Sequence, residues 1–108
     1  MQKILIAGQD VARAAALAPM AGVADTAYRQ LCCEMGAVMC VSEMISAKGL
    51  CYDSKGSAEL CRITPAERPM GLQLFGSEPE FIARAAELLM PFAPDCMVLN
   101  IACFIALR

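Results

Sequence analysis

Residues 70–100 read M-G-L-Q-L-F-G-S-E-P-E-F-I-A-R-A-A-E-L-L-M-P-F-A-P-D-C-M-V-L-N. The first six residues are an apolar run without alternation, which is typical of a strand buried on both faces. S-E-P-E at 77–80 predicts a capping box with Ser77 as the N-cap, and apolar residues then recur at helical spacing as far as Leu89. After two prolines, residues 96–101 form another apolar run. This order predicts a strand–helix–strand unit of a parallel sheet.

The same alternation extends back toward the N-terminus. A helix is expected between an N-cap at Asp25 and a stop at Gly36. The other predicted elements are a strand over 3–7, a hairpin arm over 11–16, strands over 16–20 and 37–42, a loop with one helical turn over 43–56, and a short helix over 57–62. Four strand–helix steps without closure indicate an α/β fold, a partial (β/α)8 TIM barrel preceded by a hairpin. A four-stranded open sheet is the alternative.

The composition narrows the possible chemistry. The 108 residues include no histidine, which excludes Ser-His-Asp triads, Cys-His dyads and imidazole metal sites. Seven cysteines are present but no two have C-x-x-C spacing, so no metal site is expected. Proton transfer must therefore use Cys, Tyr, Lys, Asp or Glu. The length allows one small domain but falls short of the roughly 200–250 residues that a closed barrel needs.

The charge and hydropathy of the chain indicate which binding partners and which cellular compartment to expect. Nine Lys and Arg against eleven Asp and Glu give a net charge of −2, and no basic tract marks a nucleic-acid or lipid surface. Hydrophobic residues make up 58%, yet the longest stretch without charge, residues 96–107, has 12 residues and is too short to span a bilayer. No secretory signal is visible and the cysteine count is odd. We therefore expect reduced thiols in the cytoplasm and no membrane partner.

Polar residues stand where the predicted strands end. Active sites of parallel βα barrels lie at the carboxyl ends of their strands. The residues expected there are 19–22 at the end of the first of the four strands, Glu43 after the second, Gln73 near the end of the third, Asn100 at the end of the fourth and Cys103 just beyond. The structural alternative is that Gln73 and Asn100 satisfy backbone groups, that Cys103 packs in the core, and that Glu43 binds loop amides.

Four segments resemble, in order and with matching spacing, the motifs of tRNA-dihydrouridine synthases. They are L-A-P-M-A-G-V-A-D at 17–25, S-E-M-I-S-A-K at 42–48, E-R-P-M-G-L-Q-L-F-G-S at 67–77 and L-N-I-A-C at 99–103. The first and third are most similar to the bacterial B-type branch. Other flavin barrels begin with a segment like the first, but the second and third motifs disfavour them.

The resemblance implies a flavoenzyme and assigns roles to these residues. In this family FMN is held at the mouth of a TIM barrel, NADPH reduces it, and the reduced flavin passes hydride to C6 of a uridine in tRNA. The residues that would contact FMN are Pro19, Met20, Ala21 and Gln73. Asn100 would lie between flavin and uracil with Glu43 nearby, and Cys103 would be the catalytic acid that protonates C5. A thiol is neutral below its ordinary pKa of about 8.5, so this acid needs no histidine.

The last residues depart from the family pattern. Ala102 and Phe104 stand where the family has Gly and Pro on either side of the cysteine, and residues 104–108 resemble nothing that follows there. The hypothesis of a frameshift or early stop makes residues 1–108 the N-terminal half of a flavin-binding barrel, with an apolar edge strand prone to self-association. We therefore expect the chain alone to be inactive and not to hold FMN stably. The alternative is a non-catalytic truncated remnant or a self-associating half-barrel.

Overall fold

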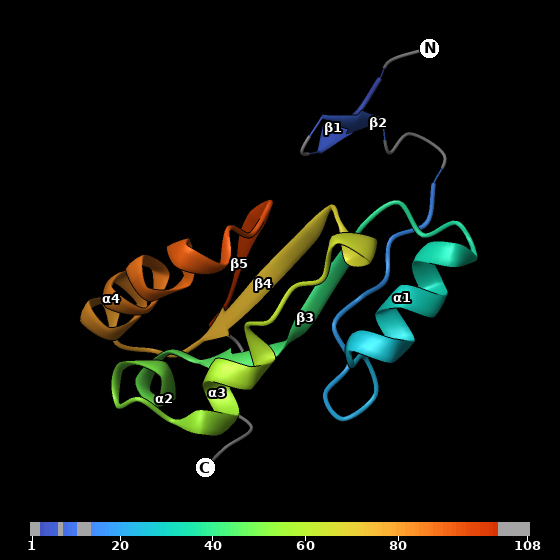
Figure 1. Ribbon diagram of the computed structural model, residues 1–108. Coiled ribbons are helices and arrows are strands. Elements are labelled where there is room, and N and C mark those ends of the chain that lie inside the picture. The colour runs from blue at the N-terminus through green and yellow to red at the C-terminus, as the bar shows by residue number, and fades with distance from the viewer. Residues whose placement is uncertain (1–2, 7, 11–13, 102–108) are drawn as a thin grey trace.

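The computed structural model describes residues 3–6, 8–10 and 14–101 (Figure 1). The elements are, in chain order, β1 (Leu5–Ile6), β2 (Gln9–Asp10), α1 (Thr26–Glu34), β3 (Cys40–Ser46), α2 (Ala47–Cys51), α3 (Lys55–Leu60), the 3-10 helix η1 (Pro65–Glu67), β4 (Met70–Phe75), α4 (Pro79–Leu89), the 3-10 helix η2 (Met90–Phe92) and β5 (Cys96–Asn100). Cys103, which we predicted as the catalytic acid, lies outside the described residues.

The main sheet is parallel, and its strands are ordered as they occur in the chain, β3-β4-β5. Leu17 adds a single parallel bridge to Cys40. The strand predicted over 16–20 is wrong beyond this bridge, because Pro19 has no N–H to donate to a ladder. The α/β class is confirmed with three parallel strands, whereas a partial barrel of four units is not confirmed.

β3 begins and ends at later residues in the chain than the strand predicted over 37–42. Pairing with β4 fixes its limits, because its first residue lies opposite Met70 and its last lies opposite Phe75. The polar pair at 42–43 interrupts the apolar run, and the sequence pattern therefore ended the strand too early.

The loop predicted over 43–56 is wrong, because the chain there completes β3 and then forms α2. The hydroxyl of Ser46 accepts the N–H of Gly49 at 3.0 Å and caps α2 directly after the strand. The helix predicted over 57–62 is present as α3 but begins earlier, because Ser54 is its N-cap.

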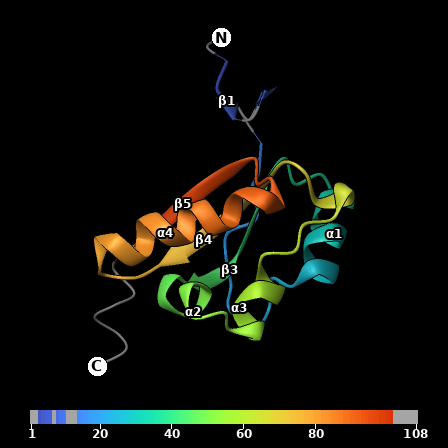
Figure 2. The same ribbon diagram turned by 60° about the vertical axis from the view of Figure 1, so that its left-hand side comes forward.

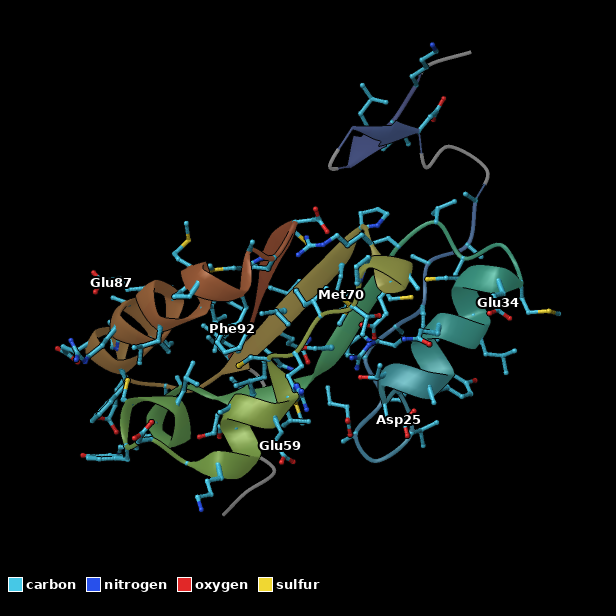
Figure 3. The ribbon with its side chains drawn as sticks, in the orientation of Figure 1. Asp25, Glu34, Glu59, Met70, Glu87 and Phe92 are labelled. Carbon is cyan, nitrogen blue, oxygen red and sulfur yellow. The ribbon has the colours of Figure 1, made fainter. Side chains whose placement is uncertain are left out.

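α1 and β4 follow the sequence pattern closely. α1 begins after Asp25, whose carboxylate accepts the N–H of Tyr28 at 2.8 Å (Figure 3). The chain turns after the helix at Gly36, where φ is +101°. β4 covers the predicted residues 70–75, and all but its last residue are buried.

The capping box predicted at 77–80 does not form. α4 begins at Pro79 with Glu78 as the N-cap, and no side chain accepts a hydrogen bond there. Proline at the first helical position has a φ suited to the helix and no N–H to satisfy, so the start is set by Pro79 rather than by Ser77. The helix ends at Leu89, as predicted.

The N-terminal hairpin is shorter than expected. β1 pairs with β2 in the antiparallel sense, with Leu5 opposite Asp10. Of the return arm predicted over 11–16, residues 11–13 lie outside the described residues and residues 14–16 form no strand. The described partner of β1 is β2, which directly follows the turn at Gly8, where φ is +79°. The hairpin extends away from the main sheet (Figure 1).

The core lies between the sheet and the helices that follow its strands. Its fully buried side chains include Ile45 of β3, Leu72 and Leu74 of β4, and Leu89 of α4. α4 lies along β4 and β5 (Figure 2). In the described part of the chain, no helix is long and apolar enough to cross a membrane.

Candidate functional site

The carboxyl ends of the three strands are in register. Ser46, Phe75 and Asn100 are the last residues of β3, β4 and β5, and they lie opposite one another. Gln73 lies two residues before the end of β4. Because side chains alternate along a strand, Gln73 is on the same face as these three residues, opposite the face on which Leu72 packs into the core.

A bulge in β3 shapes this part of the sheet. Ser42 and Glu43 occupy the place where β4 has a single residue between paired positions. The hydroxyl of Ser42 accepts the backbone N–H of Gln73 at 2.9 Å and donates to the carbonyl of Glu43 at 2.8 Å. Ser42 is fully buried and replaces the backbone acceptor that the bulge removes. It was not among the predicted site residues, although a serine inside an apolar strand was a signal.

Glu43 joins β3 to the segment that follows Leu17. Its Oε1 accepts the backbone N–H of Gly22, whose φ of +75° suits glycine. This contact agrees with the alternative stated for Glu43, in which its carboxylate binds a backbone amide of a loop. It also places Gly22, the last residue of the 19–22 segment, beside the middle of β3.

Residues 19–21 are accessible from solvent. Pro19 is half-buried, whereas Met20 and Ala21 are exposed. The carbonyl of Met20 accepts the N–H groups of Val23 and Ala24 at 3.1 and 2.8 Å, which closes a turn directly after it. The small side chain of Ala21 leaves room for a ligand to approach the backbone closely.

Gln73 has a polar atom without a partner in the described part of the chain. The residue is 6% exposed, and its Oε1 accepts no hydrogen bond from any described residue. A buried acceptor left unpaired costs about 1–3 kcal/mol, so its presence favours a ligand that donates to it. The edge of an isoalloxazine ring presents N–H and carbonyl groups side by side, and an amide at this position fits that pattern.

Asn100 is half-buried at the end of β5. Its Nδ2 donates to the Sδ of Met44 at 3.6 Å, and Met44 lies opposite Gln73 in the sheet. The structure thus brings the third and fourth predicted positions, Gln73 and Asn100, to one face of the sheet.

A buried ion pair holds the start of α1. The Nε of Arg29 lies 2.6 Å from the Oε1 of Glu67, and the two residues are 3% and 0% exposed. Arg29 also donates to the carbonyl of Ala24 at 2.7 Å, directly after the 19–22 segment. The other carboxylate oxygen of Glu67 accepts from the N–H and the hydroxyl of Thr64 at 2.7 and 3.0 Å. This network therefore restrains the chain that leaves the candidate site.

The buried thiols are poor proton donors for this site. Burial raises the pKa of Cys40 to about 12 and that of Cys61 to about 11, and both belong to the core. Burial and the adjacent Asp95 also raise the pKa of Cys96. All three thiols stay protonated near neutral pH.

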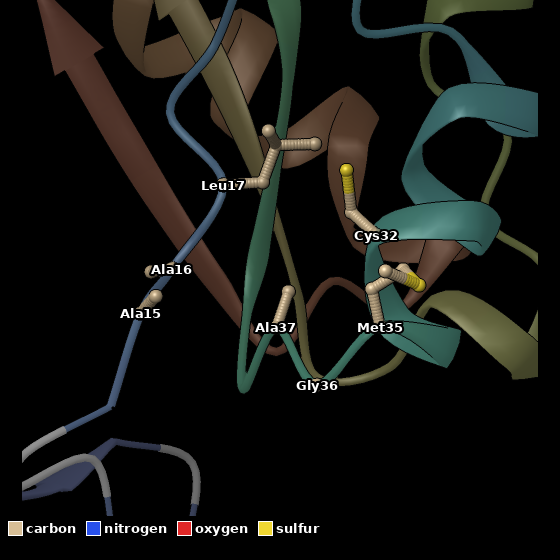
Figure 4. A pocket seen from close by; sticks show the side chains of 7 residues that line it. All are labelled: Ala15, Ala16, Leu17, Cys32, Met35, Gly36 and Ala37. Atoms are coloured by element: carbon tan, nitrogen blue, oxygen red, sulfur yellow. The ribbon is translucent and has the colours of Figure 1, made fainter.

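A groove of about 270 Å³ lies away from the candidate site, at the end of α1 (Figure 4). Its lining residues are Ala15, Ala16, Leu17, Cys32, Met35, Gly36 and Ala37. No predicted site residue is among them. Its lining carries no charged side chain, so it offers little to a polar substrate.

A parallel sheet with polar side chains near the carboxyl ends of its strands defines the class of α/β proteins that bind ligands at that edge. The family model of dihydrouridine synthases, Dus, matches residues 16–105, and the chain belongs to this family. The resemblance inferred from the four motifs is confirmed.

Individual relatives support the same assignment. The chain is 34% identical over 87 residues to tRNA-dihydrouridine synthase B of Shewanella oneidensis, covering 81% of this chain and 27% of the relative. It is 39% identical over 88 residues to a probable tRNA-dihydrouridine synthase of Aquifex aeolicus, covering 81% and 28%. A probable tRNA-dihydrouridine synthase of Treponema pallidum is 34% identical over 87 residues, covering 80% and 26%. The chain thus spans about a quarter of the length of these curated relatives.

Proposed function

We propose that this chain forms the N-terminal part of the flavin-binding TIM barrel of a tRNA-dihydrouridine synthase. The whole enzyme would reduce uridine in tRNA to 5,6-dihydrouridine, with FMN as cofactor and NADPH as reductant. The names of relatives at 34% and 39% identity support the reaction, and the sequential parallel strands support the barrel. The observation that carries the proposal is the buried Oε1 of Gln73, which has no partner among the described residues.

The residues proposed to contact FMN would bind the flavin ring and orient it. Gln73 would accept a hydrogen bond from a ring N–H of FMN, and Pro19, Met20 and Ala21 would hold the ring. Glu43 holds that segment in position through the N–H of Gly22. FMN held there would supply hydride chemistry toward C6 of the uracil, with NADPH as its reductant.

The residues on the substrate side are Asn100 and Cys103. Asn100 lies on the face that carries Gln73 and would contact both flavin and uracil. Cys103 follows on the next stretch of chain and would donate a proton to C5 of the uracil. The uridine must leave the base stack of tRNA to reach this face of the sheet. We place the reaction in the cytoplasm, with tRNA as the partner.

A chimera tests this proposal. Residues 16–101 replace the matching segment of the Shewanella oneidensis relative, and FMN affinity and dihydrouridine in tRNA are measured. We expect the chimera to bind FMN and to form dihydrouridine, and Gln73→Leu to bind FMN about tenfold more weakly. Gln30→Leu is the matched control, because it removes a part-buried glutamine that bonds Thr64 outside the site. If the folded chimera binds FMN equally well with Gln73→Leu, Gln73 is not a flavin contact.

The 108-residue chain alone makes a separate test. We expect it to lose FMN during gel filtration and to form no dihydrouridine, since most of the family barrel is absent from it. A yellow protein fraction after gel filtration would overturn this expectation.

A self-associating, non-catalytic half-barrel is the second candidate. Leu99 of β5 and the following Ile101 are 58% and 69% exposed, and such apolar side chains beside an edge strand favour association. Sedimentation velocity of the purified chain tests this candidate, because loss of FMN by the chain alone is expected under both proposals. Concentration-dependent dimers support the second candidate, and a monomer at all concentrations excludes it.

A further inference from the structure

Two cysteines that are not among the candidate flavin contacts lie against each other. Cys33, in the last turn of α1, and Cys40, the first residue of β3, have their Sγ atoms 3.5 Å apart. A disulfide needs about 2.05 Å between the two sulfurs, so the thiols must approach further to bond. The turn between them contains Gly36 with a φ of +101°, which folds the end of α1 back toward β3.

The two thiols differ in accessibility. Cys40 is fully buried, and its Sγ also lies 3.8 Å from the carbonyl of Arg29, to which it donates. Burial and the neighbouring Cys33 raise the pKa of Cys40 to about 12. Cys33 is only partly buried. A reagent from solvent therefore reaches Cys33 first, and Cys40 is held behind it as the second thiol.

Other cysteines of the described chain make different contacts. Cys51 and Cys61 donate to the carbonyls of Phe81 and Ser57 at 3.6 and 3.2 Å. Cys32 lines the groove at the end of α1 (Figure 4). The adjacent Cys32 and Cys33 thus have different surroundings, and this difference makes the pairing testable.

We propose that Cys33 and Cys40 are a dithiol–disulfide pair that is oxidised by low-molecular-weight disulfides. The thiolate of Cys33 attacks one sulfur of the small disulfide, forms a mixed disulfide and releases one small thiolate. The thiolate of Cys40 then attacks the Cys33 sulfur and releases the second. Two protein S–H bonds are replaced by one S–S bond, and the small disulfide, reduced by two electrons, leaves as two thiols with the two protons.

The crosslink would join α1 to β3 at the residue that Leu17 bridges. It would therefore fix the corner from which the N-terminal segment enters the sheet. This proposal does not depend on the proposed enzyme activity.

The experiment treats the full 108-residue chain with glutathione disulfide, alkylates the remaining thiols and analyses the digest by mass spectrometry. Trypsin releases residues 30–48 as one peptide that contains Cys32, Cys33 and Cys40. Cleavage after Glu34 then separates the first two cysteines from the third, so a crosslink holds the two fragments together. Within this peptide, the variants Cys32→Ser and Cys33→Ser each leave one possible bond, and both substitutions fall at partly buried positions.

In the folded chain, we expect Cys32→Ser to crosslink like the unmodified protein. Cys33→Ser should crosslink at least about tenfold less at the same ratio of glutathione disulfide to glutathione. In concentrated urea the two variants should crosslink equally, because the closed loops differ by a single residue. Equal crosslinking of the two variants without urea, a bond between Cys32 and Cys33, or glutathione adducts without any crosslink would each overturn the proposal.

Discussion

Replacing Glu67 by Gln should destabilise the fold strongly, although it changes only a carboxylate oxygen to an amide nitrogen. Glu67 is 0% exposed and uses both oxygens, one for Arg29 and the other for the N–H and hydroxyl of Thr64. A glutamine has one acceptor oxygen, so either Arg29 or Thr64 loses its partner. In both cases the buried guanidinium loses its counter-charge.

The magnitude follows from the burial of the pair. Removing one partner of a buried ion pair costs about 3–5 kcal/mol, because the remaining charge is left uncompensated. A domain of this size has a total stability of about 5–15 kcal/mol, so Glu67→Gln should remove a large fraction of it. The matched control is Glu78→Gln, which breaks a pair with Lys48 whose side chains are 56% and 49% exposed. That loss should be small, because solvent screens an exposed ion pair.

Urea denaturation followed by far-ultraviolet circular dichroism measures both effects. Glu67→Gln should move the midpoint to much lower urea, whereas Glu78→Gln should leave it nearly unchanged. Equal shifts for the two variants would refute the reasoning. The double variant Arg29→Met with Glu67→Leu should recover only part of the loss, because it buries no charge but leaves the carbonyl of Ala24 and the N–H of Thr64 without these partners.

Three further predictions concern backbone, packing and pH. Gly36→Ala should lower the stability of the fold by about 1 kcal/mol or more, because the φ of Gly36 is +101°. Gly56→Ala should raise the stability by about 0.5–1 kcal/mol, because Gly56 lies inside α3 and the added Cβ has only one atom near it. The midpoints of urea denaturation distinguish the two signs. Gly71→Ala places a Cβ 2.8 Å from the Sγ of Cys96 and should cost about 1–3 kcal/mol, and Cys96→Ala in the same chain should relieve most of it. Burial raises the pKa of Cys61 from 9.0 to about 11, so its contribution to stability is fully present below pH 9.0 and is lost as pH rises toward about 11. The loss of stability between neutral and alkaline pH, measured by urea denaturation, should be smaller in Cys61→Ala, and an unchanged loss would contradict this origin.

The elements predicted well were those whose signals are local. The apolar run of β4 and the helical spacing that ends at Leu89 lie within single elements, and both formed as expected. The limits of β3 depend on its partner strand, and no pattern within the segment could show where pairing with Phe75 would end. The helix start at Pro79 shows a different failure, in which two local signals competed and the proline prevailed over Ser77.

The site was predictable in part for the same reason. Gln73 and Asn100 were identified from their positions in strands, and register then placed them on one face of the sheet. The contact of Glu43 with Gly22 joins residues far apart in the chain and was foreseen only as an alternative. Ser42 was missed because its role depends on a bulge, which appears only when two strands are paired.

The order of the strands has a consequence for synthesis on the ribosome. The Leu17 segment pairs with β3, β3 with β4, and β4 with β5, so each newly made strand finds its partner already present. Nascent chains fold from the N-terminal side as they emerge. Each of the described strands β3, β4 and β5 therefore has one partner already translated when it leaves the ribosome.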